Sequence, residues 1–276
     1  MREESGYDVW VSLFDTRPDA KTGAQLLCEA RIQHRRLAAL PASVRPQSTQ
    51  EAYDCQADVV RQLLAHYGGR PVGYKIACTN TLAQRQLGVT GPFHGRLLSP
   101  FCFDSPASLP AAPFFMRVIE AEFAFQMGRD LPPGSYSREQ IAASIAGLLP
   151  AIEIVDSRFE SWTTIGVLSL ISDNACNGAW VKGKLMEDWQ HLDLAAAGVR
   201  LMVNGEVNQT GNGAAVLGHP LNALEWLVSA LAESKQGLKA GDFVSTGVTT
   251  GVYMAEAGDR IAAEFDGAGS VQVEFT

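Results

Sequence analysis

The spacing of apolar side chains divides the chain into a helical N-terminal region and a β-rich remainder. Residues 19–40 and 48–69 place apolar side chains at the spacing of two amphipathic helices. The second has clear ends, because Ser48 and Glu51 occupy the two positions of a capping box and two glycines follow at 68 and 69.

Beyond residue 70 the pattern shortens to strand-like runs between glycine- and proline-rich turns. Strands are predicted at residues 71–78, 114–127, 150–159, 198–211, 241–265 and 269–275. Helices are predicted at residues 80–88, 137–149 (capped by Ser137) and 220–237. Asn204-Gly205 predicts a tight hairpin turn, and residues 90–98 are typical of a loop. We therefore expect an α+β protein with a helical region over 1–70 and a β-rich body over 71–276, joined as one continuous unit.

One predicted strand segment, VIEAEFAFQM at residues 118–127, carries two carboxylates in an otherwise apolar sequence. Side chains alternate between the faces of a strand, so Glu120 and Glu122 share one face, about 7 Å apart. Two buried carboxylates repel each other and lose hydration, and they then need a cation or a shared proton. The alternative is a strand with one face open to water, which is common in antiparallel sheets.

A third acid, Glu153, stands between two isoleucines on the predicted strand 150–159. Three carboxylates on neighbouring strands would form a site of hard oxygen ligands suited to Mg²⁺ or Mn²⁺. The sequence does not show that these strands are neighbours, so an acid on a wet edge strand is the alternative. Lys75 lies inside the apolar segment 71–78, where it either extends to solvent or enters a polar pocket and serves in proton transfer.

Composition narrows the class of protein. The 276 residues are 46% hydrophobic and 19% charged, which is ordinary for a globular protein. The net charge of −8 argues against nucleic acid and anionic membrane surfaces as partners. No apolar stretch reaches the roughly 18 residues of a membrane span, and the start MREESGYDVW does not resemble a signal peptide. Five unevenly spaced cysteines suit free thiols in a reducing compartment, so we expect a cytoplasmic protein.

Two loops are unusually rich in Ser, Thr, Asn and Gly, at residues 172–178 and 245–251. Such loops can offer hydroxyl, amide and N–H groups to an anionic ligand, although most are ordinary turns. His94 in the predicted loop 90–98 is a candidate for proton chemistry or a solvated side chain. The sequence has no P-loop, GxGxxG, HExxH or GxSxG motif, which disfavours kinases, dinucleotide enzymes, zinc proteases and α/β-hydrolases.

Six ordered stretches carry a family resemblance. They are VGYKIACTN…LGVTGPFHGRL, EAEFAF…RDLP, PAIEIVDSRF, SDNACNGAWVKG, NGEVNQTGNGAAVLGHPLNALEWL and LKAGDFVSTGVTTG. Together they resemble the 2-keto-4-pentenoate hydratase family, which includes 2-oxohept-3-ene-1,7-dioate hydratase and 4-oxalocrotonate decarboxylase and belongs to the fumarylacetoacetate hydrolase superfamily. The resemblance covers roughly residues 70 to 275. It implies a mixed β-sandwich roll of the fumarylacetoacetate hydrolase C-terminal type, and homo-oligomers or complexes with a related decarboxylase or hydratase.

The resemblance also implies a metal site with an acid–base residue. The family's E-x-E pair falls on Glu120 and Glu122 and its third acidic ligand on Glu153, which together would hold one Mg²⁺ or Mn²⁺. The family's active-site lysine falls on Lys75.

Substrate-side positions of the family fall on Asp173, Asn174 and Thr250. One departure concerns the predicted loop, where relatives often carry an aspartate at the position of Phe93. His94 beside it is a candidate substitute, and the loss of the acid leaves the reaction and the substrate open.

By this resemblance the protein is a hydratase of aromatic-compound catabolism. It would add water to a 2-hydroxy-2,4-dienoate or 2-oxo-4-enoate to give a 4-hydroxy-2-oxo acid, through a metal-stabilised enolate with Lys75 shuttling protons. A 4-oxalocrotonate-type decarboxylase would use the same electron sink. A β-diketone hydrolase with His94 as base, a non-catalytic ligand-binding paralogue or partner subunit, and a structural domain without a ligand are further alternatives.

Overall fold

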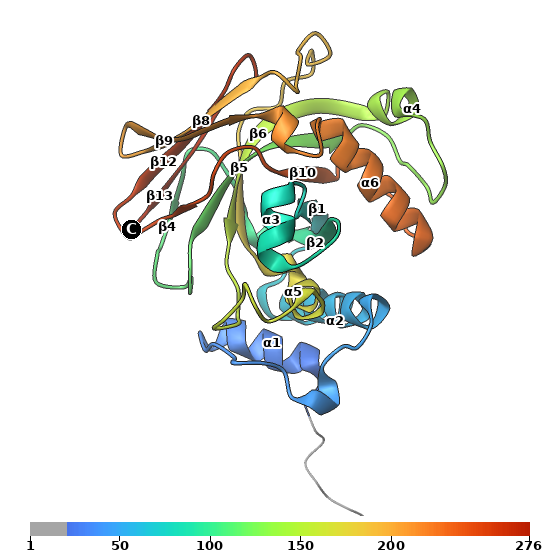
Figure 1. The fold of residues 1–276 in the computed structure, drawn as a ribbon, viewed down its shortest axis with the longest axis vertical. Coiled ribbons are helices and arrows are strands. Elements are labelled where there is room, and N and C mark those ends of the chain that lie inside the picture. The colour runs from blue at the N-terminus through green and yellow to red at the C-terminus, as the bar shows by residue number, and fades with distance from the viewer. Residues whose placement is uncertain (1–20) are drawn as a thin grey trace, which may run out of the picture.

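The computed structural model describes residues 21–276 (Figure 1). The N-terminal stretch MREESGYDVW and the first two residues of the predicted helix 19–40 lie outside the described residues. The helices are α1 (Gly23–Ile32), α2 (Thr49–Tyr67), α3 (Thr81–Leu87), α4 (Arg138–Ala142), α5 (Val167–Ser172) and α6 (Pro220–Glu233), with 3₁₀ turns η1 (Ala42–Val44), η2 (Ser99–Phe101), η3 (Asn174–Cys176) and η4 (Gly213–Ala215). The strands are β1 (Pro71–Ala77), β2 (Phe93–Leu98), β3 (Cys102–Asp104), β4 (Ala107–Leu109), β5 (Val118–Met127), β6 (Ile145–Val155), β7 (Asn177–Lys182), β8 (Gly198–Val203), β9 (Glu206–Asn212), β10 (Phe243–Val248), β11 (Tyr253–Met254), β12 (Arg260–Phe265) and β13 (Gly269–Phe275).

The strands form two mixed sheets. The larger has the order β2-β1-β10-β5-β6-β7-β3 with β11 beside β5, and the smaller has the order β4-β13-β12-β8-β9. The pairs β1–β10, β3–β7 and β4–β13 are parallel, whereas the other pairs are antiparallel. The fold is therefore the predicted mixed β-sandwich roll with helices in its N-terminal region.

The main core lies between the two sheets. Ile119, Ala121, Phe123 and Phe125 point from one face of β5 into it and are buried. The Phe123 ring centroid lies 4.9 Å from that of Phe265 on β12 in the smaller sheet. Burying a phenylalanine contributes about 1.5–3 kcal/mol, so this alternating face of β5 holds the sheets together. The opposite face of β5 is thereby left to the two glutamates.

At the end of the molecule drawn in blue, α1 packs on α2, which in turn packs on α5 (Figure 1). Their apolar side chains form a separate buried cluster with Leu98 and Phe159. Ser48 caps α2 by accepting a hydrogen bond from the Glu51 N–H, as the sequence predicts, and Gly68 ends it. The proposed division of the chain at residue 70 stays a prediction.

Three predicted elements differ from the structure. The helix predicted at 137–149 ends at Ala142, and the apolar run from Ile145 enters β6 instead, because a short apolar run fits a buried strand as well as a helix. The loop predicted at 90–98 contains β2, which pairs with β1. The first helix ends at Ile32 rather than extending to residue 40, since His34 adopts a positive φ of 49° that a helix cannot accommodate.

The hairpin at Asn204-Gly205 is confirmed, with positive φ at both turn residues between β8 and β9. Gly73 shows where a glycine is needed, because a Cβ there would lie 1.9 Å from the Phe243 carbonyl oxygen of the neighbouring strand. Among the described residues, no helix has the length and apolar character needed to span a bilayer.

Candidate metal and substrate site

The three predicted acidic ligands come together on one face of the larger sheet. β5 and β6 are antiparallel neighbours, with Glu120 directly opposite Glu153 in their register. Glu122 lies two residues further along β5 on the same face. One carboxylate oxygen of each residue lies within 4.8 Å of the others, a spacing that a single divalent cation can bridge. The neighbouring strands that the sequence could not establish are therefore present.

Two of these carboxylates are held by hydrogen bonds from other strands. Ser245 of β10 donates to Glu122 Oε2, and Trp180 Nε1 of β7 donates to Ser245 Oγ over 2.9 Å. Asn177 Nδ2, at the start of β7, donates to Glu153 Oε1 over 3.2 Å. The sequence had pointed to the loops 172–178 and 245–251 but not to Asn177 and Ser245 within them, and nothing local marks Trp180. These contacts fix the direction of each carboxylate before any ligand arrives.

The remaining oxygens identify what the site lacks. Glu122 Oε1 and Glu153 Oε2 are buried and have no hydrogen-bond partner among the described residues. Burial and the charge of Glu153 raise the pKa of Glu120 to about 7. Burial, Glu153 and Glu120 raise the pKa of Glu122 well above its usual value. Three carboxylates, two of them with an unpaired buried oxygen, and one lysine form a cluster short of positive charge, so the donor set fits a hard divalent cation.

Lys75 is the positive charge in this cluster. Its Nζ lies 3.1 Å from Glu153 Oε1, and the side chain is 2% exposed. Burial alone would lower the pKa of Lys75, but the charges of Glu153, Glu120, Cys176 and Glu122 outweigh it and raise that pKa. The sequence left open a lysine whose pKa falls in a pocket, whereas the acidic groups around Lys75 raise its pKa and favour the protonated form. Lys75 can therefore hold a proton beside the carboxylates.

A cavity of about 910 Å³ opens beside this cluster. Its lining includes Lys75 and Glu120, together with Phe93 and Thr250. Thr250 Oγ1 donates to its neighbour Gly251, a local bond that a ligand could replace. The cavity therefore joins one of the carboxylates, Glu120, with the lysine and the predicted threonine in one space.

His94 lies outside this cavity. Side chains alternate along β2, so Phe93 faces the cavity while His94 points to the other face, between Tyr53 and Tyr74. Burial, together with the charge of Arg96, lowers the pKa of His94 to about 3. The prediction that His94 replaces the missing aspartate is not supported by this position, because its imidazole is packed among aromatic rings and is neutral at ordinary pH.

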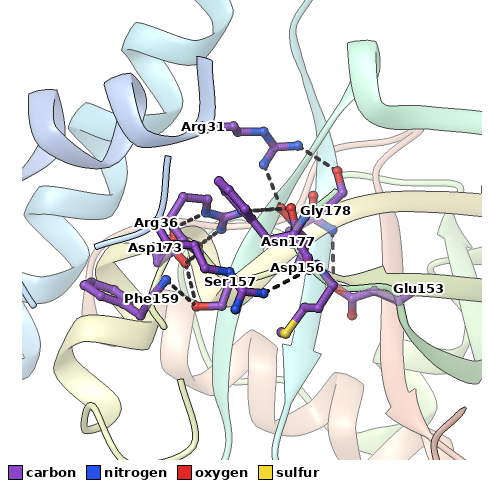
Figure 2. Close-up of polar contacts among 12 residues, drawn as sticks. Arg31, Arg36, Glu153, Asp156, Ser157, Phe159, Asp173, Asn177 and Gly178 are labelled. Atoms are coloured by element: carbon purple, nitrogen blue, oxygen red, sulfur yellow. Dashed lines mark hydrogen bonds and ion pairs between the residues drawn. The ribbon is translucent and has the colours of Figure 1, made fainter. Parts of the chain in front are cut away.

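Asp173 also lies outside the cavity lining, in a buried ion-pair network (Figure 2). Its Oδ1 lies 2.5 Å from Arg158 Nε, and its Oδ2 accepts from the Arg158 N–H and the Ser157 hydroxyl. Arg31 of α1 donates to the Asn177 and Gly178 carbonyls, at 2.7 Å each. Figure 2 shows this network beside Asn177, which in turn reaches Glu153. Asp173 thus braces the segment that carries Asn177.

Asn174 has a comparable structural position. Its Oδ1 accepts from the Arg96 N–H and its Nδ2 donates to the Arg96 carbonyl, which joins the turn η3 to β2. Asn174, Ala175 and Cys176 all adopt positive φ values, a strained run that these bonds hold in place. The turn presents Ala175 and Cys176 to the cavity. The structure therefore gives Asp173 and Asn174 supporting positions, and direct substrate contact by either stays a prediction.

Known proteins share this architecture. The family described as fumarylacetoacetate (FAA) hydrolase C-terminal matches residues 104–276. A 2-keto-4-pentenoate hydratase of Paraburkholderia xenovorans (strain LB400) is 32% identical over 94% of this chain and 96% of its own. A 2-hydroxyhexa-2,4-dienoate hydratase of Comamonas testosteroni is 34% identical over 93% of this chain and 97% of its own.

A solved structure agrees with these sequence relationships. The 4-oxalocrotonate decarboxylase from Pseudomonas putida G7, complexed with magnesium and adipate, superposes with a TM-score of 0.85 at 29% identity, over 92% of this chain and 95% of that one. Sequence and structure agree over nearly the whole chain, which belongs to the 2-keto-4-pentenoate hydratase family of the fumarylacetoacetate hydrolase superfamily.

Proposed function

We propose that this protein is a divalent-cation-dependent hydratase that converts a 2-hydroxy-2,4-dienoate into a 4-hydroxy-2-oxo acid in aromatic-compound catabolism. The observation that carries the proposal is the cluster of half-buried Glu120 with buried Glu122 and Glu153, short of positive charge and placed beside Lys75 at a ligand-sized cavity. Hydratases that are 32% and 34% identical over almost their whole length support the same reaction class.

The three glutamates would hold Mg²⁺ or Mn²⁺. Such a cation supplies Lewis-acid stabilisation of negative charge on the 2-oxygen of a 2-oxo acid. The buried, unpaired oxygens of Glu122 and Glu153 support this assignment, and magnesium in the related decarboxylase supports a divalent cation in general. The choice between Mg²⁺ and Mn²⁺ is part of the proposal.

Lys75 would move the proton. During tautomerisation the 2-hydroxyl loses a proton and C5 gains one, which leaves a 2-oxo-3-enoate whose C4 accepts water and whose C3 takes the final proton. Lys75 Nζ holds an exchangeable proton at the carboxylates and lines the cavity, so it can deliver and recover these protons. Thr250, which also lines the cavity, would hydrogen-bond the substrate.

Decarboxylation is the second candidate. The structure with a TM-score of 0.85 is a 4-oxalocrotonate decarboxylase, and the same stabilisation of charge at the 2-oxygen would serve departing CO₂. A β-diketone hydrolase has less support, because its candidate base His94 lies outside the cavity lining.

One experiment separates these reactions. Purified protein with Mg²⁺ or Mn²⁺ is given 2-hydroxypenta-2,4-dienoate and, in parallel, 4-oxalocrotonate, and loss of dienol absorbance is followed with product identification. A 4-hydroxy-2-oxo product supports the hydratase and released CO₂ the decarboxylase. No turnover by protein that still binds the metal would instead favour a non-catalytic ligand-binding paralogue or partner subunit.

The assembly and location are also proposals. We expect a homo-oligomer or a complex with a related decarboxylase or hydratase, on the basis of the family resemblance, and light scattering after gel filtration would measure its mass. A cytoplasmic location is supported by the five cysteines, all of which are free thiols. Cell fractionation tests it.

A further inference from the structure

The cavity continues in only one direction from the carboxylates. Along β5 and β6, Glu120 and Glu153 are followed on the same face by Val118 and Val155, which are themselves register partners about 7 Å further on. In the opposite direction, beyond Glu122, the sheet face is closed by a buried apolar cluster that includes Ala124 and Trp180. The body of a substrate held at the carboxylates therefore has room on the valine side.

Phe93 lies on that same side. It is the register partner of Ala77, whereas Gly95 is the partner of Lys75, so Phe93 is displaced from the lysine in the direction of the valines. Phe93, Val118 and Val155 belong to one buried apolar cluster with Leu170 and Cys176, and all five line the cavity. Phe93 is thus part of an apolar wall of the cavity.

The cavity lining offers little positive charge to a substrate. Within the part of the chain that the structure describes, Lys75 is the one cationic side chain in the lining, and it is already paired with Glu153. The other polar lining groups are mostly neutral amides and hydroxyls, and Asn80 and Gln84 already bond to the backbone. A second carboxylate at the far end of a substrate would lose hydration without gaining a cation, which is unfavourable.

The size of the cavity also favours a substrate with a substituent at its far end. At about 910 Å³ it lies near the upper end of the roughly 300–1,000 Å³ that hold drug-sized ligands. A dienoate that ends in hydrogen would leave much of the wall at Phe93 uncovered.

We propose that the substrate of this site carries an uncharged, apolar substituent at its far end, an alkyl or aryl group, and that Phe93, Val118 and Val155 contact it. This inference rests on the proposed function for the 2-oxo acid head, and it adds the chemical class of the tail. It makes Phe93 a specificity-determining residue rather than a lost acid.

Binding of unreactive analogues tests the tail without turnover. Isothermal titration with Mg²⁺ present would compare 2-oxopentanoate, 2-oxohexanoate, 2-oxooctanoate and the dicarboxylate 2-oxohexanedioate. Each buried CH₂ is expected to tighten Kd about fourfold. The dicarboxylate is expected to bind at least about tenfold more weakly than 2-oxohexanoate. Equal or tighter binding of the dicarboxylate, or a Kd that ignores chain length, would overturn the proposal.

Variants locate the effect. Phe93→Ala is expected to reduce the gain from 2-oxopentanoate to 2-oxooctanoate, whereas Phe103→Ala, a partly buried phenylalanine of β3 outside the cavity lining, keeps it. Phe93→Leu keeps an apolar wall and is expected to retain the chain-length dependence. Loss of this dependence in Phe103→Ala, or its full retention in Phe93→Ala, would contradict the assignment.

Turnover of 5-alkyl and 5-phenyl dienoates separates this inference from the proposed function. If no dienoate is hydrated while the binding series keeps its chain-length dependence, the hydratase proposal fails and the apolar tail stands. If dienoates are hydrated with equal kcat/KM for hydrogen, alkyl and carboxylate tails, the hydratase stands and the inference fails.

Discussion

Glu120 and Glu153 face each other directly across β5 and β6, so the register of the sheet places two carboxylates opposite one another. Like charges at such positions destabilise a sheet. Lys75 offsets part of this repulsion through Glu153, and a bound divalent cation would offset the rest. The facing carboxylates therefore lower the stability of the metal-free protein.

Replacing one acid should separate stability from metal binding. Glu120→Gln removes a like-charge pair, so we expect the metal-free variant to unfold about 1–3 °C higher than the parent protein. The rise in unfolding temperature caused by Mg²⁺ or Mn²⁺ should be largely lost, because a ligand oxygen is gone. Differential scanning calorimetry with and without metal measures both. Glu122→Gln should likewise weaken metal binding, whereas Glu274→Gln, an exposed acid of β13, serves as the control.

Lys75→Met should impair both the fold and the reaction. The substitution keeps the length of the side chain but leaves Glu153 buried without the ammonium group of Lys75. Breaking a buried ion pair costs about 3–5 kcal/mol. Saturating metal should restore part of that loss, since the cation supplies positive charge. We expect kcat to fall about 10²-fold or more, because the proton carrier is lost. Unfolding measured with and without metal checks the loss of stability, and dienol turnover checks the fall in kcat. A near-normal kcat in a folded variant would exclude Lys75 as the proton carrier.

His94 should make the fold sensitive to acid. Its pKa is about 3 in the folded protein, mainly because of burial, compared with 6.5 for an ordinary histidine. Between these values the unfolded chain binds a proton that the folded chain does not. His94 therefore does not reduce the free energy of unfolding above about pH 6.5. As the pH falls from 6.5 toward 3, the free energy of unfolding decreases by up to about 1.4 kcal/mol per pH unit.

Urea unfolding between pH 4 and pH 7 tests this effect on His94→Phe. The stability of the variant relative to the parent protein should increase as the pH falls across this range. His191→Gln, which changes an exposed imidazole, is the control. A constant difference between the parent protein and His94→Phe across the range would show that His94 does not titrate with folding.

The sequence predicted those parts of the site that local periodicity determines. The alternation of a strand is enough to put Glu120 and Glu122 on one face, and the apolar flanks of Glu153 indicated a second strand, although they left open whether it was buried or a wet edge. Ser245 and Trp180 were not predictable in their roles, because their contacts join strands far apart in the chain. Such pairings depend on the order of strands in the sheet, which no short pattern encodes.

The interpretation of His94 shows how an error in secondary structure propagates. A loop at 90–98 leaves every side chain free to reach the site, whereas β2 assigns Phe93 and His94 to opposite faces. Proline and two glycines gave this segment the composition of a turn, and its pairing with β1 overrode that preference. The fold class could be predicted from the sequence because several elements independently indicated it. The direction of the His94 side chain, in contrast, depended on the prediction of a single element.

Asp173→Asn should distinguish a supporting residue from a substrate ligand. Asp173 is buried, lies 2.5 Å from Arg158 Nε through one oxygen and accepts two further bonds through the other. Loss of its charge leaves the guanidinium of Arg158 buried with Asp156, 3.9 Å away, as its remaining acidic neighbour. We expect the free energy of unfolding to fall by about 3 kcal/mol. KM should change less than about twofold below the unfolding transition, because Asp173 is absent from the cavity lining.

Thr250→Val provides the matched comparison, since Thr250 lines the cavity and takes part in no buried network. We expect its stability to stay within about 0.5 kcal/mol of the parent protein and its KM to rise about 3- to 10-fold, the value of one hydrogen bond. Metal affinity provides a further check on Asp173→Asn, because Asn177, which Arg31 and Arg158 hold through its carbonyl, donates to Glu153. A looser segment should weaken metal binding a few-fold in Asp173→Asn and leave it unchanged in Thr250→Val. The opposite pattern, with a stable Asp173→Asn that has a greatly raised KM, would make Asp173 a substrate ligand despite its place in the network.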